Sequence, residues 1–291
     1  MRSIYEQALG EEFKLLHPRM QERFGFSSKD GRASIGKGTM DKIWRGKFFT
    51  LPFLYVGSWR RIMFPERGTA IPFTLRNFAY VDPFGRETVT WIRNFETHHP
   101  RRFDAYMIYS QQRRCIIDYL GTHQHLAVDI RLSVDQRGGL CLRSGSQRFY
   151  EGLIGFTFPL LFSGVADVCE WYEDGDRKFH IEVNVHNDTW GPLFGYRGKF
   201  DSEWVKVNEG NIPPLAGAPR AQRVERRPGN NLNSNLRYRH SRSLADSTGI
   251  FTAFSFSFHK EVLSSTVSAQ ASINFRLRLI RYSRRVLTVQ T

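Results

Sequence analysis

The sequence predicts a mainly β protein in which a curved antiparallel sheet forms a barrel or half-barrel with N-terminal helices packed on it. Apolar and polar residues alternate in most segments after Ser34, and short turn sequences rather than long helical patterns separate these segments. Consecutive strands with short connections form antiparallel sheets, and a long twisted sheet curls on itself. The 291 residues, 41% of them hydrophobic, suffice for a packed core.

The first 25 residues carry helix signals. Ser3 and Glu6 have the spacing of a capping box, which satisfies backbone N–H groups at a helix start. Pro18 suits the first turn of a second short helix that ends near Gly25. We expect the two helices to act as a lid or a brace for the sheet.

The clearest strand covers residues 179–186, in which four apolar side chains alternate with His, Glu, Asn and His. One face of this strand is therefore core, and the other is wet or functional. The Asp-Gln-Arg-Gly-Gly turn at 135–139 joins two alternating runs into a hairpin. Further strands are expected around 74–80, 87–95, 103–109, 115–120, 126–134, 140–142, 166–172 and 199–207.

Positive charge is concentrated at the end of the chain. Residues 1–211 hold 29 Lys and Arg against 25 Asp and Glu, a net of +4, whereas residues 212–291 hold 13 against 3, a net of +10. We therefore expect one β-rich domain over 1–211 and a basic, Arg-, Ser- and Asn-rich tail over 212–291, partly disordered and with a late hairpin near 251–286. The abrupt change also fits a fusion or a shifted reading frame. A charged tail does not predict specific nucleic-acid binding.

Export and metal-binding signals are lacking in the sequence. Residues 1–10 contain no apolar signal core, and the longest apolar stretch, 154–162, is interrupted and too short to span a membrane. These patterns predict a cytoplasmic protein without a membrane span. The three cysteines have no short spacing, which favours buried reduced thiols over a disulfide framework or a zinc site.

The common catalytic motifs are absent from the sequence. No GxGxxG, GxSxG, HExxH or CxxC pattern occurs, so Rossmann cofactors, a hydrolase nucleophile and the usual zinc sites have no sequence support. We expect no cofactor and no metal.

Two histidines form the first candidate site. His123 and His125 are two residues apart, so on a strand they share one face and could hold a metal or a carboxylate together with Asp118. No third ligand follows at a fixed spacing. Hydrogen-bonded surface histidines are therefore the favoured interpretation.

The second candidate set is Arg102, Asp104 and Tyr106, which share one face of a predicted strand. Such a charged set could line a cavity and orient a ligand. An exposed sheet face with an ion pair explains the pattern equally well.

The third candidate segment, residues 190–198, combines glycines, aromatic side chains and one guanidinium, with Trp190, Tyr196 and Arg197 as candidate ligand contacts. A tight connection before the last core strand explains it without a ligand. The apolar segment 155–162 is expected to be a core connector, or alternatively the entrance to a lipophilic cavity or a docking patch.

Four segments carry a family resemblance: Gly57 to Glu66, Arg101 to Tyr109, Asp118 to His125 and Trp190 to Gly198. Together they resemble the bacterial domain-of-unknown-function family 4166, and the likeness spans about Ser3 to Val207. In that family, similar domains stand alone, follow a saccharopine-dehydrogenase-like reductase domain, or follow a membrane-spanning region as in YndJ-like proteins. The resemblance implies a bacterial origin and a single domain, and it implies no catalytic residue.

The favoured functional hypothesis is a non-catalytic module that binds a lipophilic or aromatic molecule in the barrel, oriented by Arg102, Tyr106 and Arg197. The alternative is an enzyme acting on a small carbonyl or ester substrate, with Asp104 or Asp118 as base and His123 or Tyr106 as acid. A third hypothesis is an accessory domain that docks on a reductase-like or membrane partner.

Overall fold

The computed structural model describes residues 2–59, 61–121, 124, 126–151, 154–157, 164–189 and 191–207. The expected tail and its late hairpin lie outside these residues. The strands are β1 (Arg32–Arg45), β2 (Gly68–Val81), β3 (Glu87–Phe95), β4 (Arg101–Ser110), β5 (Cys115–Leu120), β6 (Leu126–Val134), β7 (Leu140–Glu151), β8 (Ile154–Thr157), β9 (Val165–Glu173), β10 (Lys178–Asn187) and β11 (Gly191–Lys206).

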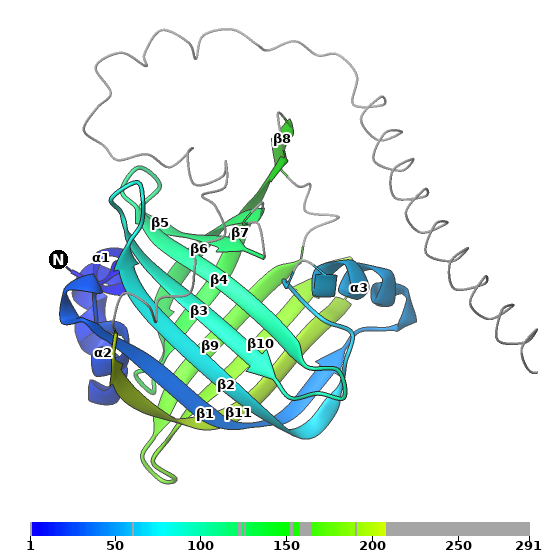
Figure 1. The fold of residues 1–291 in the computed structure, drawn as a ribbon, viewed down its shortest axis with the longest axis horizontal. Helices are drawn as coiled ribbons and strands as arrows, with labels where there is room; N and C mark the ends of the chain where they lie inside the picture. Colours follow the sequence, from blue (N-terminus) through cyan, green and yellow to red (C-terminus); the bar gives the residue numbers. More distant parts are fainter. Residues whose placement is uncertain are drawn as a thin grey trace, which may run out of the picture. The chain divides into compact units, whose positions relative to one another are not determined.

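Ten of these strands close into an antiparallel barrel (Figure 1). The order is β6-β5-β4-β3-β2-β1-β11-β10-β9-β7, and β7 pairs again with β6 to complete the ring. Strand β8 is added outside the ring as a hairpin with β7. The expected antiparallel barrel with helices packed on it is confirmed.

The N-terminal helices begin where the sequence predicts. The Ser3 hydroxyl accepts a hydrogen bond from the Glu6 amide at 3.1 Å, and the Ser3 amide donates to the Glu6 carboxylate at 2.9 Å. Pro18 occupies the first turn of its helix, which Gly25 follows directly. The helical segments are α1 (Ile4–Leu9), η1 (Gly10–Leu15), α2 (Pro18–Phe24), η2 (Ser28–Asp30), η3 (Phe48–Thr50) and α3 (Leu51–Trp59).

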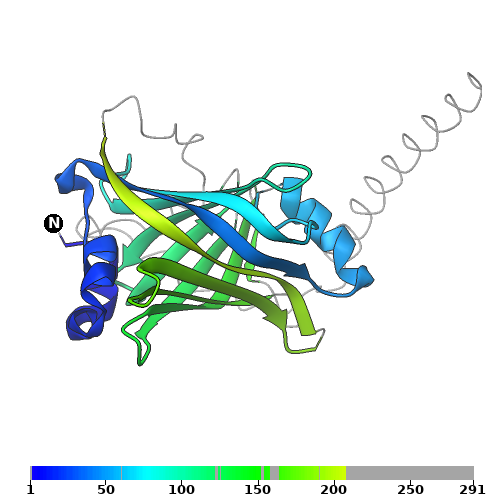
Figure 2. The same ribbon diagram turned by 90° about the horizontal axis from the view of Figure 1, so that it is seen from below.

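Helices α1 and α2 close one end of the barrel (Figures 1 and 2). Their apolar side chains, including Ile4, Leu9 and Phe24, join the same core cluster as the inward side chains of the strands. The Trp91 indole N–H on β3 donates to the Tyr5 hydroxyl on α1 at 2.9 Å, so the helix is fixed by a buried hydrogen bond as well as by packing. The helices therefore form a plug.

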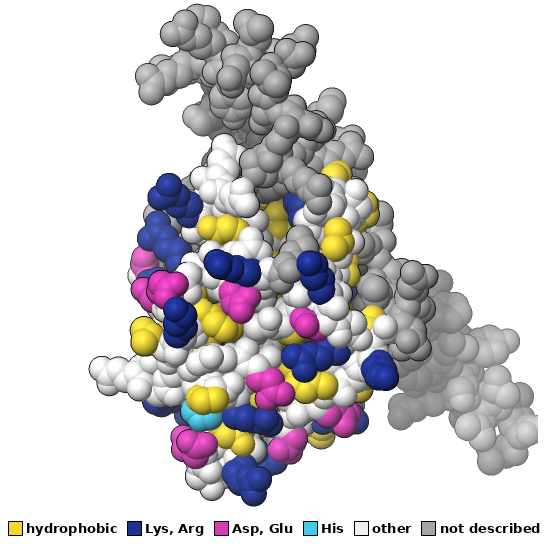
Figure 3. All heavy atoms as spheres, turned by 90° about the vertical axis from the view of Figure 1, so that its left-hand side faces the viewer, with side chains coloured by type: hydrophobic (Ala, Val, Ile, Leu, Met, Phe, Trp, Pro, Cys, Tyr) yellow, Lys and Arg dark blue, Asp and Glu magenta, His cyan; other side chains and the backbone are white. Residues whose placement is uncertain are grey.

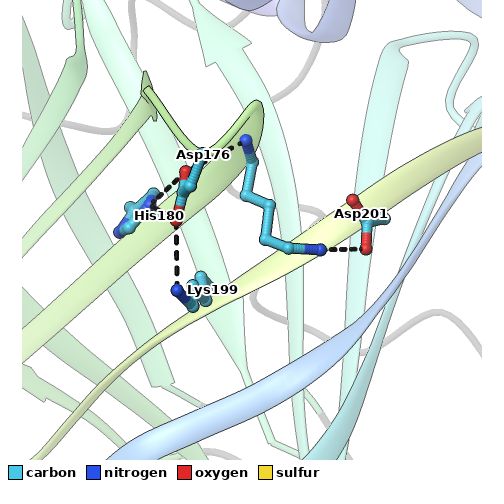
Figure 4. Close-up of polar contacts among 5 residues, drawn as sticks. Asp176, His180, Lys199 and Asp201 are labelled. Atoms are coloured by element: carbon cyan, nitrogen blue, oxygen red, sulfur yellow. Dashed lines mark hydrogen bonds and ion pairs between the residues drawn. The ribbon is translucent and has the colours of Figure 1, made fainter. Parts of the chain in front are cut away.

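Alternation along each strand separates the interior from the outer surface. On β10, Phe179, Ile181 and Val183 belong to the core cluster, so the intervening side chains of the strand face outward. Figure 4 shows the outward group: Asp176 accepts from His180 and from Lys199, each at 3.1 Å. The His180 hydrogen bond lowers the pKa of the Asp176 carboxyl. This exposed cluster is an ordinary surface ion-pair group.

Residues 191–198 are not the tight connection that the sequence favours but the first half of strand β11. The glycine at position 195 allows close packing of neighbouring groups against the strand and does not form a turn. A Cβ at Gly195 would lie 2.4 Å from the Trp44 ring and 2.5 Å from the Val183 carbonyl oxygen. Glycine is needed here so that neighbouring groups can approach the backbone.

The expectation of reduced thiols is wrong for two of the three cysteines. Cys141 on β7 and Cys169 on β9 lie directly opposite each other in the sheet and form a disulfide, with their Cα atoms 4.2 Å apart. The 28-residue separation hides this pairing in the sequence, because it becomes close only through the strand order of the barrel.

The opposite end of the barrel carries helix α3, which the sequence analysis did not predict (Figure 2). Leu54 of α3 and Phe64 after it are buried in the core cluster and anchor the segment. The Phe64 ring packs on Phe95 and Phe194 with centroid distances of 5.0 and 4.8 Å. Among the helices that the structure describes, none is long and apolar enough to cross a membrane.

Candidate functional site

Charged and polar side chains occur inside the barrel, among the aromatic core. They enter from strands on opposite sides of the ring and from helix α2, and all are at least nine-tenths buried. Buried polar groups are costly unless they are paired, so each needs a structural or functional reason. The residues are Arg23, Ser34, Asn77, Arg93, Asp118, Glu170 and Tyr196.

Arg93 is the central cation of this interior. It lies on β3 between Trp91 and Phe95, both core residues, and is 4% exposed. Its guanidinium donates to the Tyr196 hydroxyl across the barrel at 3.0 Å and lies 3.9 Å from the centroid of the Phe103 ring. Its Nε has no hydrogen-bond partner among the described residues. The close contacts of Arg93 are thus with a hydroxyl group and aromatic rings, while its charge also acts on the buried Asp118 and Glu170 carboxyls.

Asn77 projects from β2 and is 1% exposed. In the β2–β3 register it lies opposite Trp91, which places it diagonally from Arg93 on the inner face. Within the described part of the chain, neither its amide nitrogen nor its amide oxygen has a hydrogen-bond partner. An amide offers two donors and an acceptor, so Asn77 presents unused hydrogen-bonding capacity to the interior.

Asp118 is the one residue of the predicted candidate set with a carboxyl group inside the barrel. It is 9% exposed and accepts a hydrogen bond from the Tyr106 amide at 3.1 Å. Burial raises the pKa of its carboxyl to about 7, and the nearby Arg93 charge only partly opposes this increase. Asp118 can therefore be protonated or ionised near neutral pH.

A buried ion pair joins helix α2 to the barrel wall. The Arg23 guanidinium pairs with the Glu170 carboxylate of β9, and both side chains are almost wholly buried. Arg23 also donates to Ser34 at 2.7 Å and lies over the Phe200 ring at 4.9 Å. Burial raises the pKa of Glu170 even though Arg23 acts in the opposite direction. The pair ties the helical plug to the interior.

Aromatic rings fill the barrel between Arg93 and helix α3. Phe95 packs edge-on against Tyr196 with centroids 5.1 Å apart, and its ring is also in contact with Phe64 and Phe73. The part of the interior next to α3 is thus apolar.

The second predicted set lies elsewhere. Phe103 and Ala105 of β4 are core residues, so Arg102, Asp104 and Tyr106 share the outer face of that strand. Arg102 Nε donates to the Asp104 carboxylate at 2.7 Å. These three residues do not line the interior of the barrel. The expectation that they line a cavity there is therefore wrong. Their arrangement is the ion pair on an outer sheet face.

The third predicted set is divided between the two faces. Tyr196 is buried inside the barrel, whereas Arg197, the next residue on β11, is exposed on the outer face. Strand alternation requires this separation. Trp190, His123 and His125 lie outside the described residues.

The sequence analysis missed the four charged or amide residues that matter most in the interior. A weak signal was available, because Arg93 and Glu170 interrupt apolar positions in otherwise alternating strands. A charged residue at an apolar position is the pattern of a buried functional group. The missed residues are Arg23, Asn77, Arg93 and Glu170.

The fold and the site define the class: an antiparallel barrel, plugged by helices at one end, with a polar group inside an aromatic interior. Barrels of this size are either filled by side chains or enclose a ligand. The chain belongs to the family described as Domain of unknown function (DUF4166), whose model matches residues 16–200. The family expected from the four sequence segments is confirmed.

The chain is also similar to a curated protein over most of its length. The chain is 34% identical over 205 residues to the "Uncharacterized protein YndH" of Bacillus subtilis (strain 168). The alignment covers 70% of this chain and 98% of that protein. No solved structure matches the chain.

Proposed function

We propose that this domain is a non-catalytic binding module that holds a lipophilic or aromatic molecule with one acidic group inside the barrel. The observation that carries the proposal is the interior group of Arg93 and Asn77. The Arg93 guanidinium is a buried cation without an ion-pair partner among the described residues, and the Asn77 amide atoms have no hydrogen-bond partner among those residues. A carboxylate would accept hydrogen bonds from both side chains. The orienting residues are thus Arg93, Asn77 and Tyr196 rather than Arg102 and Arg197.

The aromatic interior supports the apolar part of the ligand. The Phe103 ring lies against the Arg93 guanidinium, and Phe64, which follows α3, packs on Phe95 and Phe194. Ligand sites in proteins are mostly apolar, with a few polar groups that fix orientation. Arg93 has the role of such an orienting group in this proposal.

The test is a fluorescence titration of the full chain with cis-parinaric acid and with its methyl ester. We expect wild type to bind the acid more tightly than the ester, and Arg93→Met to lose about tenfold or more in affinity for the acid alone, because a hydrogen bond to a charged group contributes roughly 1.5–3 kcal/mol. Arg197→Met is the matched control, since it removes a guanidinium from the outer face of the same barrel.

Asn77→Leu provides a second variant that is not expected to unfold. It replaces an amide that has no partner in the described structure by an apolar group of similar size, so the fold is kept or stabilised while one ligand contact is lost. Equal affinity for acid and ester in wild type, or unchanged acid binding in Arg93→Met, would contradict the proposal.

The enzyme alternative rests on Asp118. A buried carboxyl with a pKa of about 7 is suited to general base catalysis near neutral pH. Tyr106 lies on the outer face of β4, so it is not placed to act as the acid partner of Asp118 in the interior. Because the Arg93 charge that acts on Asp118 also suits simple binding of an acidic molecule, the binding module is the function that we favour.

The wider context of the domain remains as proposed from the sequence. We propose a domain boundary near residue 211 and a reductase-like or membrane protein as the protein partner. The proposed location is the cytoplasm, although the Cys141–Cys169 disulfide is a bond that persists mainly in oxidising compartments. Cell fractionation decides whether the protein is located in the cytoplasm or in an oxidising compartment.

A further inference from the structure

Helix α3 and the η3 turn before it, residues 48–59, expose an unusual amount of apolar surface. Eight large apolar side chains are exposed among the described residues, and five of them lie in this segment. Phe48 is 83% exposed and Phe53 is 63% exposed. Contiguous exposed apolar surface marks a binding site rather than chance. The five residues are Phe48, Phe53, Tyr55, Val56 and Trp59.

The helix has a buried side and an exposed side. Leu54 and Gly57, three residues apart, are both buried; Leu54 packs in the core cluster, and Gly57 lies against Met63. Tyr55 and Trp59 are four apart, so they are neighbours on the helix surface, and both are exposed. The exposed side is rich in aromatic residues, including Tyr and Trp, which favour the boundary between water and hydrocarbon.

The charge around the segment is positive. Residues 42–67 contain six Lys and Arg against one acidic residue, Glu66. Glu66 is already paired with Arg101 at 2.5 Å, whereas Lys47 and Arg67 are exposed. An apolar aromatic surface with a cationic border is complementary to an anionic lipid surface. The chain's own tail is itself cationic, so it lacks that complementarity.

The opposite end of the barrel is different. Figure 3 shows the side of the molecule on which the N-terminal helices lie, where acidic and basic side chains are interspersed. Leu15 is the exposed large apolar residue of the described N-terminal helices, at 68%. Among the exposed large hydrophobic side chains of the described residues, all the aromatic ones lie in residues 48–59.

We propose that residues 48–59 dock this protein on the surface of an anionic lipid bilayer, with the aromatic side chains inserted among the headgroups. The inference rests on this exposed surface and not on the barrel interior. Docking would hold the α3 end of the barrel, which has the aromatic interior beneath it, against the lipid.

The test is sedimentation of the full chain with two kinds of vesicle. One contains phosphatidylcholine alone, and the other also contains about 30% phosphatidylglycerol, which supplies the anionic charge. We expect binding to the anionic vesicles and a loss of about tenfold or more in Phe48→Ser/Phe53→Ser, because buried apolar area sets the affinity of interfacial helices. Leu15→Ser, an equally exposed apolar residue at the other end, is the matched control and should bind as wild type does.

A second readout reports on insertion itself. Brominated acyl chains in the vesicles should quench tryptophan fluorescence in wild type and quench it much less in Trp59→Phe. Binding that is unchanged in Phe48→Ser/Phe53→Ser would overturn the proposal and assign the affinity to the cationic tail. Lack of binding to either vesicle would overturn it as well. Acid binding by the barrel in solution should be the same in Phe48→Ser/Phe53→Ser, which separates this proposal from the one for the interior.

Discussion

Replacing Arg23 by Met is expected to lower the free energy of unfolding by about 3–5 kcal/mol at pH 7, because removal of one partner leaves an uncompensated buried charge. The partner is Glu170, whose carboxyl is fully buried, and the Arg23 guanidinium itself lies over the Phe179 and Phe200 rings. Arg23 also supplies the polar contacts of helix α2 to Ser34 and Ser202. Urea denaturation of the full chain measures the change.

Arg19→Met is the matched control on the same helix. Arg19 pairs with Glu22 at 2.8 Å, but both side chains are well exposed, so its loss should change the unfolding free energy by about 0.5 kcal/mol or less. The double variant Arg23→Met/Glu170→Leu should recover most of the loss, since an apolar pair of similar volume replaces the ion pair. A double variant no more stable than Arg23→Met would contradict the role of this pair.

Asp118→Asn should change how stability depends on pH. The Asp118 carboxyl has a pKa of about 7 in the folded protein, against 3.8 without the protein environment. Between these values the folded state binds more protons than the unfolded state, so wild type loses stability as pH rises. A difference of about three pKa units corresponds to a loss of roughly 4 kcal/mol in the unfolding free energy of wild type. The Asp118→Asn variant has no carboxyl at this position and does not show this loss.

The measurement is the unfolding free energy of both proteins from pH 4 to pH 8. The advantage of Asp118→Asn over wild type should grow with pH and level off above pH 7. Asp176→Asn is the control of opposite sign, because the hydrogen bond from His180 lowers the pKa of that exposed carboxyl. A constant difference between Asp118→Asn and wild type would show that Asp118 is not held in an apolar interior.

The barrel could be predicted from the sequence because its strands alternate. Residues 126–134 and 179–186 show the period of two clearly, and both are strands of the ring. Helix α3 could not be predicted in this way, since residues 51–59 are apolar on the exposed side as well as on the buried side. A helix without a polar face has no period to detect.

The candidate site could be predicted only in part, because strand alternation shows which residues share a face but not which face is inside. Arg102, Asp104 and Tyr106 do share a face, and the structure places that face outside the barrel. Arg93 and Asn77 are brought together by the β2–β3 register. Register depends on turns and on packing across the barrel, which a single sequence does not specify.

The central claim is that the barrel holds a lipophilic acid against Arg93, and native mass spectrometry of freshly purified protein tests it most directly. We expect wild type to carry a stoichiometric adduct that organic extraction releases as a lipophilic acid, and Arg93→Met to carry much less of it. Adduct-free protein that also fails to bind added fatty acid, or an adduct retained equally by wild type and Arg93→Met, would contradict the claim.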